Sequence, residues 1–432
     1  MPRCWNRPAP WRRTSPRSST IWPWRAPSRA RPRRPARCSS PLPTARCTSA
    51  SARRRDDCGI PWPATDHAGG EGVVTRHLLH VFPSFEVGGA QVRTATWING
   101  LGAEYRHTIV SLDGDTGARD RLDPDLEVTF ATAPDAGGHL PGRLLACRRF
   151  ICAAAPHALI TNNWGSIEWA LAGHGAGCQL LHVESGFGSE EAERDFPRRA
   201  LARRFVLAGS TRVVVPSRRL LDRALDSWGL AAGRVMLVPD GIDCALFARA
   251  ARVPRPPDGR LVVGTVAVLR EEKRLDLLID AFAVLRGTMP ASLVIVGDGP
   301  EREALVRHAA RVGLSADVEF TGFRRDVEHC YAGFDIFALS SETEQMPNSV
   351  LQAMAAGLPV VTTAVGDVAR MVAEDNLPFV VPPRDVAALA AAIGQLAREP
   401  ERRAAIGAAN RRRAFAAFDV RRMVEAYRHL LL

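Results

Sequence analysis

Residues 340–361 read SSETEQMPNSVLQAMAAGLPVV, and the order of residue types in this stretch decides the fold. A polar loop follows an apolar run, a segment of helical period begins near Asn348 and Ser349, and Gly357 precedes a second apolar run at 359–363. Asparagine and serine are favourable N-cap residues, and glycine commonly ends a helix. This order predicts a strand, a loop, a helix and a further strand, which is the repeating unit of a parallel α/β sheet.

The same alternation of short apolar runs and longer helical segments extends over the chain from residue 77 onward. Strands of the first half are expected at 78–82, 107–112, 126–131, 158–161, 180–183, 213–217 and 235–239. Those of the second half are expected at 261–269, 293–297, 318–322, 335–340, 359–363 and 379–382. Between the halves, 248–260 is rich in Pro, Arg and Gly, as an exposed hinge would be.

This pattern predicts an α/β fold of two Rossmann-like, doubly wound domains. The first domain is expected over 77–247 and the second over 261–415, with the hinge between them. A final helical segment over 416–432 is expected to bridge the two domains.

The charge of the chain is concentrated at its beginning. The 57 Lys and Arg residues exceed the 46 acids by 11, which would ordinarily suggest a nucleic-acid partner. Residues 1–76 alone contain 16 Arg against four acids, so the remainder is close to neutral and no nucleic-acid partner is expected for it. The leader lacks apolar periodicity and contains many prolines, so we expect it to be disordered or to precede the true start of translation. A transit peptide, a basic tail and a disulfide module are its alternatives.

Residues 77–432 show the composition of a soluble protein, and their cysteines are expected to be free thiols in a reducing, cytoplasmic environment. No run approaches the roughly 18 apolar residues of a membrane span, and the cysteines lack the spacing of a zinc site or a disulfide framework. Two Asp-x-Asp patterns, at 113–115 and 123–125, resemble a metal-binding motif, but such short patterns arise readily in turns. We predict that they are solvated turns and that the protein uses no metal or other cofactor.

Polar and glycine-rich clusters follow the expected strands. A parallel α/β sheet binds ligands beyond the carboxyl ends of its strands, so these clusters are candidates for a binding site. An anion suits the helix end at 348–349, because backbone N–H groups and the helix dipole favour negative charge there. Glu344 lies just before that helix, where a carboxylate is better suited to neutral hydroxyl groups such as those of a sugar. The clusters contain Gly88 and Gly89, Asn162, His182, Arg270 to Lys273, Gly297 to Pro300, Gly322 to Arg324 and Ser340 to Asn348.

Six blocks in this order resemble glycosyltransferase family 4, which comprises retaining, nucleotide-sugar-dependent enzymes of the GT-B fold. The blocks are HVFPSFEVGGAQ (80–91), VPDGID (238–243), EEKRLDLLIDAF (271–282), LVIVGDGPERE (293–303), FTGFRRDV (320–327) and the stretch 340–361. The resemblance implies transfer of a sugar from a nucleotide-sugar to a glycan or lipid-linked acceptor in bacterial envelope or exopolysaccharide biosynthesis. The cytoplasm, with or without peripheral contact at the inner face of the cell membrane, is the expected location.

The resemblance assigns roles to three residues of the second half. Lys273 matches the lysine that neutralises the departing diphosphate, and it is the only lysine among 57 basic residues, which argues against a merely solvated cation. Glu344 matches the first glutamate of the family's E-x7-E signature, which contacts the donor sugar. Gln352 replaces the second glutamate, which binds the nucleotide ribose. The family's arginine aligns with Val268, and Arg270 is a candidate substitute.

The remaining assignments concern the sugar, the donor and the acceptor. His182 matches a histidine near the transferred sugar, although a lone strand histidine is more often a buried polar residue. Gly297 and Gly299 would let the backbone approach the nucleobase. Further donor contacts are expected from Phe323, Gln345, Met346, Pro347, Asn348 and Ser349, and acceptor or phosphate contacts from Gly88, Gly89 and Asn162.

The sequence also bears on three other functions and on the role of one surface helix. A dehydrogenase is disfavoured because no G-x-G-x-x-G opens a helix after an expected strand. A GT-B sugar epimerase and a non-catalytic sugar-nucleotide binder or partner subunit stay open, the latter because of Val268 and Gln352. The helix expected at 198–209 combines four arginines with apolar residues, and it fits either a membrane-docking helix or a core helix with a solvated basic face.

Overall fold

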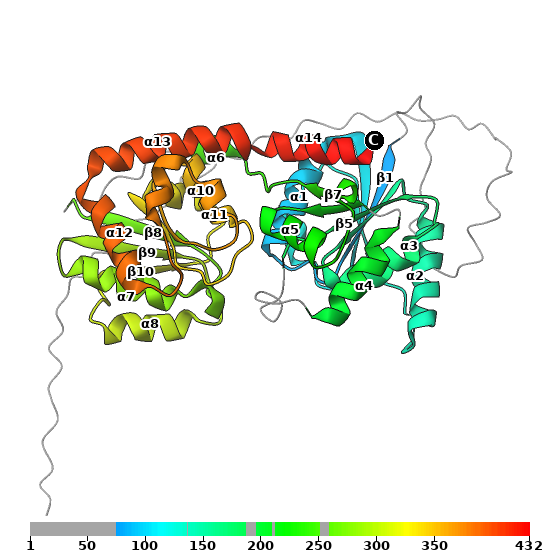
Figure 1. The fold of residues 1–432 in the computed structure, drawn as a ribbon, viewed down its shortest axis with the longest axis horizontal. Coiled ribbons are helices and arrows are strands. Elements are labelled where there is room, and N and C mark those ends of the chain that lie inside the picture. The colour runs from blue at the N-terminus through cyan, green and yellow to red at the C-terminus, as the bar shows by residue number, and fades with distance from the viewer. Residues whose placement is uncertain (1–74, 136, 187–195, 210–211, 251–258) are drawn as a thin grey trace, which may run out of the picture. The chain divides into compact units, whose positions relative to one another are not determined.

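The computed structural model describes residues 75–135, 137–186, 196–209, 212–250 and 259–432. These residues form two sheets with packed helices, each built from the strand and helix alternation expected from the sequence (Figure 1). Expectations for the leader at 1–74 and for most of the hinge, at 251–258, fall outside the described residues.

Seven parallel strands form the first sheet, in the order β3-β2-β1-β4-β5-β6-β7. Its strands are β1 (Arg76–Phe82), β2 (Tyr105–Ser111), β3 (Val128–Thr132), β4 (Ala158–Asn162), β5 (Gln179–Val183), β6 (Arg212–Val215) and β7 (Val235–Leu237). The helices between them are α1 (Gly89–Leu101), α2 (Leu140–Ala154), α3 (Ile167–Gly173), α4 (Pro197–Ala208) and α5 (Arg218–Asp226), and α6 (Cys244–Arg249) follows β7.

Six parallel strands form the second sheet, in the order β10-β9-β8-β11-β12-β13. Its strands are β8 (Leu261–Val266), β9 (Ala291–Val296), β10 (Val318–Gly322), β11 (Ile336–Leu339), β12 (Val360–Thr363) and β13 (Val380–Val381). The helices after its strands are α7 (Leu275–Arg286), α8 (Arg302–Arg311), α9 (Val327–Ala332), α10 (Asn348–Ala355), α11 (Val368–Met371) and α12 (Val386–Arg398).

Alternate residues of the central strands are buried on opposite faces of their sheet. Leu78 and Phe82 of β1 join an apolar cluster with α1, whereas Leu79 and Val81 join a separate cluster with α2 and α3. Successive side chains of a strand point to opposite faces, so two buried faces give the continuous apolar runs read from the sequence.

Each sheet has one point at which its strand order reverses. This switch point lies between β1 and β4 in the first sheet and between β8 and β11 in the second. Ligands of open α/β sheets bind outside the carboxyl ends of the strands at such a point. Gly88 and Gly89 follow β1 and Asn162 ends β4, whereas Lys273 follows β8 and Glu344 follows β11. Both groups of predicted site residues therefore lie at switch points.

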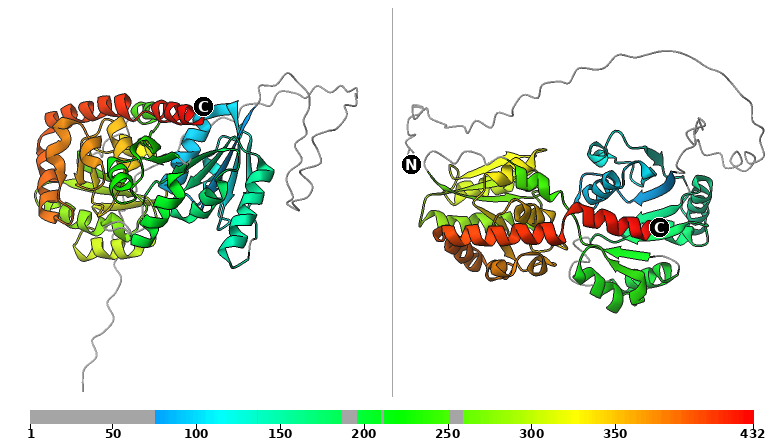
Figure 2. Two further views of the ribbon diagram at one scale, coloured as in Figure 1. Left: turned by 45° about the vertical axis from the view of Figure 1, so that its right-hand side comes forward. Right: turned by 90° about the horizontal axis from the view of Figure 1, so that it is seen from above.

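Two consecutive helices end the described chain. The helix α13 (Pro400–Ala417) buries Ile406 and Ala414 in the apolar clusters of the second sheet. The following helix α14 (Val420–Leu431) buries Met423, Val424 and Tyr427 in the core of the first sheet. Figure 2 shows the two helices (red) running one after the other. The final helical segment, expected over 416–432, thus begins at Val420 and completes the core of the first domain.

The predicted α/β fold class is confirmed, and all thirteen expected strands are present. The strand expected at 261–269 ends earlier, at Val266, because the next residues pair with the turn after β9: Ala267 donates to Val296 and Leu269 donates to Asp298. Within the described residues, no helix is both long and apolar enough to span a membrane.

Candidate active site

Lys273 and Glu344 form an ion pair at the switch point of the second sheet. The Nζ atom of Lys273 donates to Oε1 of Glu344 at 2.6 Å, and the two side chains are only 21% and 12% exposed. The hydroxyl of Ser341 donates to the same carboxylate oxygen at 2.8 Å. The structure thus brings together the two residues that the sequence predicted at the diphosphate and at the sugar.

The helix α10 begins immediately after this pair. The structure corrects the predicted N-cap: Pro347 holds that position, and Asn348 and Ser349 are the first two helical residues. No side chain among the described residues caps the helix, and Oδ1 of Asn348 is buried there without a hydrogen-bond partner. Its first-turn N–H groups therefore keep the character of an anion site.

Gln352 lies one turn into α10 and contacts a buried phenol. The hydroxyl of Tyr331 donates to Oε1 of Gln352 at 2.8 Å and lies 3.2 Å from the carbonyl oxygen of Ser349. Burial raises the pKa of Tyr331 well above its ordinary value, so the hydroxyl stays protonated. The ribose contact predicted for Gln352 stays a prediction.

Gly297 and Gly299 shape the loop that carries Lys273. A Cβ atom on Gly297 would stand 1.8 Å from the carbonyl oxygen of Ala267, and one on Gly299 would stand 2.5 Å from that of Leu269. The turn after β9 therefore packs directly against the backbone that leads to Arg270, which is exposed. These contacts give both glycines a structural reason, and their approach to a nucleobase stays a prediction.

The other predicted donor residues differ in their exposure. Phe323 is 57% exposed. The Oε1 atom of Gln345 accepts a hydrogen bond from Ser217 at 3.2 Å. Met346 is buried, and its sulfur accepts the backbone N–H of Asp240 at 3.3 Å. Phe323 lines a pocket together with Val87, Gly117, Asp120, Arg121 and Arg325.

The first sheet places the predicted glycines and Asn162 at its own switch point. Gly88 is the N-cap of α1, and Gly89 is its first residue. Asn162 is buried at the end of β4, where its Nδ2 atom donates to the carbonyl oxygen of Val81 at 3.2 Å. This bond joins the ends of β1 and β4, so Asn162 ties the two central strands together beside the glycine loop.

His182 lies in the interior of the first domain. It is wholly buried in β5, its Nδ1 atom lies 2.9 Å from the hydroxyl of Thr161, and its Nε2 atom lies 3.6 Å from the carboxylate of Glu184. Glu184 also contacts the buried Arg203 at 3.3 Å. These are the contacts of a buried polar network, and a direct role of His182 at the sugar stays a prediction.

The two Asp-x-Asp patterns form local turns. Asp113 accepts bonds from the hydroxyl of Ser111 and the N–H of Asp115, and Asp123 accepts the N–H of Asp125. Each carboxylate thus satisfies nearby donors in its own loop. Among the described residues, no three His, Cys, Asp or Glu side chains cluster in a way that would hold a metal ion.

Three local features near the site were not predicted from the sequence. Ser341 binds Glu344, Tyr331 binds Gln352, and Arg274 follows Lys273 with a left-handed backbone. The sequence places Ser341 in the polar loop, but it does not predict the hydrogen bond of Ser341 to Glu344. Tyr331 comes from another helix, and arginine carries no sequence signal for a positive φ.

Two family models match the chain, one on each sheet. The model "Glycosyl transferase 4-like domain" matches residues 88–241, and "Glycosyl transferases group 1" matches residues 248–413. Together they span well over half of the chain.

Curated relatives and solved structures agree with these matches. The chain is 28% identical over 317 residues to a D-inositol 3-phosphate glycosyltransferase of Frankia alni, covering 68% of this chain and 76% of that protein. It is 34% identical over 215 residues to a GDP-mannose-dependent alpha-(1-6)-phosphatidylinositol monomannoside mannosyltransferase of Mycolicibacterium smegmatis, covering 46% of this chain and 56% of that protein. Anabaena Alr3699/HepE, solved with UDP, superposes with a TM-score of 0.70 at 20% identity, covering 83% of this chain and 99% of that one. That protein has also been solved with UDP-glucose.

The order of the strands, the residues at the two switch points and the matches over both sheets lead to one assignment. The chain belongs to the GT4-type glycosyltransferases of the GT-B fold and is a glycosyltransferase.

Proposed function

We propose that this glycosyltransferase retains anomeric configuration and moves a sugar from a nucleotide-sugar to a glycan or lipid-linked acceptor in bacterial envelope or exopolysaccharide biosynthesis. The Lys273–Glu344 pair at the switch point of the second sheet carries the proposal. A nucleotide-sugar donor contains a dianionic diphosphate and an uncharged sugar. Lys273 is suited to bind the diphosphate, and Glu344 is suited to bind the sugar hydroxyl groups. The UDP and UDP-glucose bound by HepE, and the GDP-mannose-dependent relative with its lipid substrate, support the donor and acceptor classes.

The departing diphosphate gains negative charge as the bond from the anomeric carbon to its oxygen breaks. Lys273 and the first-turn N–H groups of α10 stabilise that charge, which develops fully only in the transition state. This positive charge comes from the chain itself, so the proposed reaction uses no metal ion. Gly297 and Gly299 hold the Lys273 loop against the nucleotide, and Arg270 extends the positive edge.

The acceptor hydroxyl attacks the anomeric carbon from the face that the leaving group vacates. A new carbon–oxygen bond forms, and the hydroxyl proton passes to the departing phosphate oxygen, which yields the glycoside and a nucleoside diphosphate. Glu344 accepts hydrogen bonds from sugar hydroxyls and orients the ring, while Gln352 contacts the ribose. His182 of β5 and Glu184, which follows that strand, support the sugar end.

The test is an assay of the full chain with UDP-, GDP- and ADP-sugars, each with glycan and lipid-linked acceptors. We expect one nucleotide to be released in an acceptor-dependent way, and proton NMR to show the donor's anomeric configuration in the product. The Lys273→Ala variant is the matched control and should release nucleotide about 100-fold more slowly, at a rate that is still measurable. An inverted product would overturn the retaining mechanism, and silence with every donor would overturn the donor class.

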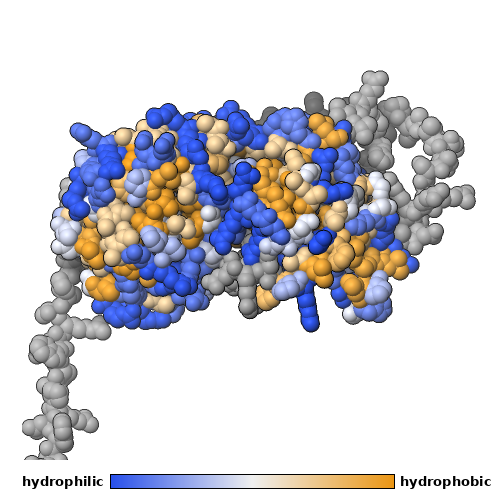
Figure 3. Space-filling model, in the orientation of Figure 1, coloured by the Kyte–Doolittle hydropathy of each residue, from blue (hydrophilic) through white to orange (hydrophobic). Residues whose placement is uncertain are grey.

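The proposal includes a membrane contact at the cytoplasmic face through α4. Its outer face carries Leu201 and Phe205, which are 54% and 71% exposed, together with exposed Arg198 and Arg204. One of the four arginines departs from the expected solvated basic face, because Arg203 is buried while Arg198 and Arg204 are exposed. Figure 3 shows apolar and polar surface side by side on this region. Such a mixed face suits the interface of an anionic bilayer.

Co-sedimentation of the full chain with phosphatidylglycerol-containing and phosphatidylcholine-only vesicles tests this contact. We expect binding to the anionic vesicles only, and its loss in a Leu201→Ser/Phe205→Ser variant. Val284→Ser removes a similarly exposed apolar side chain from α7 and should bind as the parent does. Equal binding by all three proteins would contradict a contact through α4.

A further inference from the structure

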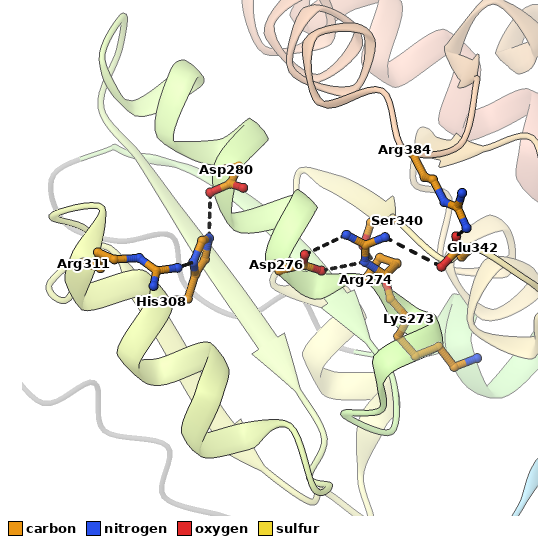
Figure 4. A network of polar contacts seen from close by, with 9 residues as sticks. All are labelled: Lys273, Arg274, Asp276, Asp280, His308, Arg311, Ser340, Glu342 and Arg384. Carbon is orange, nitrogen blue, oxygen red and sulfur yellow. Dashed lines mark hydrogen bonds and ion pairs between the residues drawn. The ribbon is translucent and has the colours of Figure 1, made fainter.

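A cluster of charges lies beside Lys273 and joins three loops of the second domain. The guanidinium of Arg274 binds both oxygens of Asp276, at 3.1 and 2.9 Å, and its third nitrogen lies 3.7 Å from Oε2 of Glu342. Arg384 pairs with the other carboxylate oxygen of Glu342. Figure 4 shows Arg274 and Arg384 approaching Glu342 from two sides, with Lys273 next along the chain. Arg274, Glu342 and Arg384 come from the loops after β8, β11 and β13, and Asp276 lies in the first turn of α7.

Both arginines adopt a backbone conformation that their side chains disfavour. Arg274 has a φ of 45° and Arg384 a φ of 62°, in the left-handed region that normally belongs to glycine. Residues held in this way persist only where surrounding contacts over-determine them, and they concentrate at functional sites. Here the shared contact is the carboxylate of Glu342.

The cluster is connected directly to the proposed active site. Three consecutive residues of the Lys273 loop attach to the segment 340–342. The carbonyl oxygen of Glu272 accepts the N–H of Glu342 at 2.8 Å, and that of Lys273 accepts the hydroxyl of Ser340 at 2.9 Å. The side chain of Arg274 supplies the third attachment. Glu344 lies two residues beyond Glu342, so the same contacts fix the loops that carry both members of the Lys273–Glu344 pair.

These ion pairs contribute little to the stability of the fold. The side chains of Arg274, Glu342 and Arg384 are 25%, 28% and 65% exposed, and partly exposed pairs gain modest energy in water. The disfavoured backbone angles offset part of that gain. Because the left-handed backbone of these arginines adds little net stability, we explain it by the position that it gives to the loops around Lys273.

We propose that Arg274, held by Asp276 and Glu342, is a positioning residue that sets where the ammonium of Lys273 stands. This inference rests on the proposed function, because it needs Lys273 to act on the donor. Small displacements of a positioned group lower rates strongly, by as much as about 100-fold for 1 Å. Arg274 acts through Lys273 and needs no contact with the substrate.

The test variant is Arg274→Gly, since glycine accepts the left-handed backbone and lacks the guanidinium. We expect an unchanged or higher melting temperature and a kcat lower by about 10- to 100-fold, with the donor KM unchanged, because Lys273 acts mainly in the transition state. Glu342→Gln should lower kcat in the same way, and Arg274→Lys should restore part of it.

Two comparisons separate positioning from general destabilisation. Arg286→Ala removes a pair of similar exposure, which joins Arg286 to Asp317 at 3.0 Å on another loop, and it should leave kcat unchanged. The double variant Arg274→Gly/Lys273→Ala should be no slower than Lys273→Ala alone, because residues that act as a unit are not additive.

Each outcome identifies the hypothesis that fails. Wild-type kcat in Arg274→Gly together with a defective Lys273→Ala would overturn the positioning role and leave the proposed function standing. Normal turnover in Lys273→Ala would overturn the proposed site. Fully additive losses in the double variant would show that Arg274 acts independently of Lys273 and would also overturn the inference.

Discussion

The hydroxyl of Tyr331 donates a hydrogen bond to Oε1 of Gln352 at 2.8 Å from a wholly buried ring. This bond engages the side-chain oxygen of Gln352 as an acceptor. The NH2 group of the same side chain is therefore the part that can donate a hydrogen bond to a ligand. A glutamate at the same position would accept the tyrosine bond and present a negative charge instead. The Tyr331–Gln352 pair therefore changes the chemistry offered by the first turns of α10.

Gln352→Ala is expected to lower the free energy of unfolding by about 1–2 kcal/mol, because the buried hydroxyl of Tyr331 loses its side-chain acceptor. Gln352→Glu keeps an acceptor and should retain stability, while changing the donor KM more than kcat. Urea denaturation and donor titration measure the two effects. Equal donor affinity in all three proteins would show that residue 352 does not contact the nucleotide.

Lys273→Ala and Glu344→Ala are each expected to reduce transfer by about 100-fold or more, because each removes a group aimed at the reacting bond. The fold should survive, since the hydrogen bonds that join Glu272 and Lys273 to Glu342 and Ser340 through their backbone oxygens remain. Rate assays and far-UV circular dichroism check the two statements. Glu303→Ala removes a highly exposed carboxylate and should behave as the parent does; unimpaired transfer in either site variant would remove the assignment.

Gly297→Ala is expected to destabilise the second domain by about 2 kcal/mol or more. Gly297 has a φ of 133°, and the added Cβ would meet the backbone oxygen of Ala267, which cannot move aside as a flexible side chain can. Gly313 also has a positive φ, of 78°, but its Cβ would meet nothing within 4 Å. Thermal unfolding should therefore show a smaller loss for Gly313→Ala, and equal losses would rule out the collision.

Stability is expected to fall as pH drops from about 6.5 to 4. Burial lowers the pKa of His77 and of His107 to about 4, with further lowering by Arg106 for the former and by His77 for the latter. Burial also lowers the pKa of His80 well below its ordinary value. These histidines take up protons first in the unfolded chain, so the native state is favoured above pH 6.5 and loses that advantage on acidification. One such histidine lowers the free energy of unfolding by at most about 1.4 kcal/mol per pH unit over this range.

Urea unfolding between pH 7 and 4.5 measures this dependence. Replacing His429, which is largely exposed, with Gln should leave the profile unchanged. A free energy of unfolding that stays flat over this range would contradict the buried, neutral state of the three histidines.

The sequence predicts the sheets well because strands buried on both faces leave continuous apolar runs. It also predicts that Lys273 and Glu344 belong to one site, since their motifs follow strands that end at the same edge. The sequence contains no direct sign of their 2.6 Å contact, which depends on how β8 and β11 come to be neighbours.

Two local features could not be predicted for physical reasons. The N-cap of α10 is Pro347, whereas residue preferences favoured Asn348 and Ser349, because those preferences rest on a side-chain cap bond that this helix lacks. On α4, the sequence predicts that Arg203 is a solvated charge. In the structure it is buried between the rings of Trp164 and Trp228, at 4.9 and 4.8 Å, which come from other elements.

The packing of α14 also constrains when the first domain can finish folding during synthesis. Tyr427 stacks on Trp97 at 4.5 Å, and Arg76 donates to the carbonyl oxygen of Leu431 across 355 positions of sequence. A ribosome must therefore synthesise the whole second domain before the core of the first domain can close. During translation the nascent first domain keeps an apolar face open, and it depends on the rest of the chain, or on a chaperone, to cover that face.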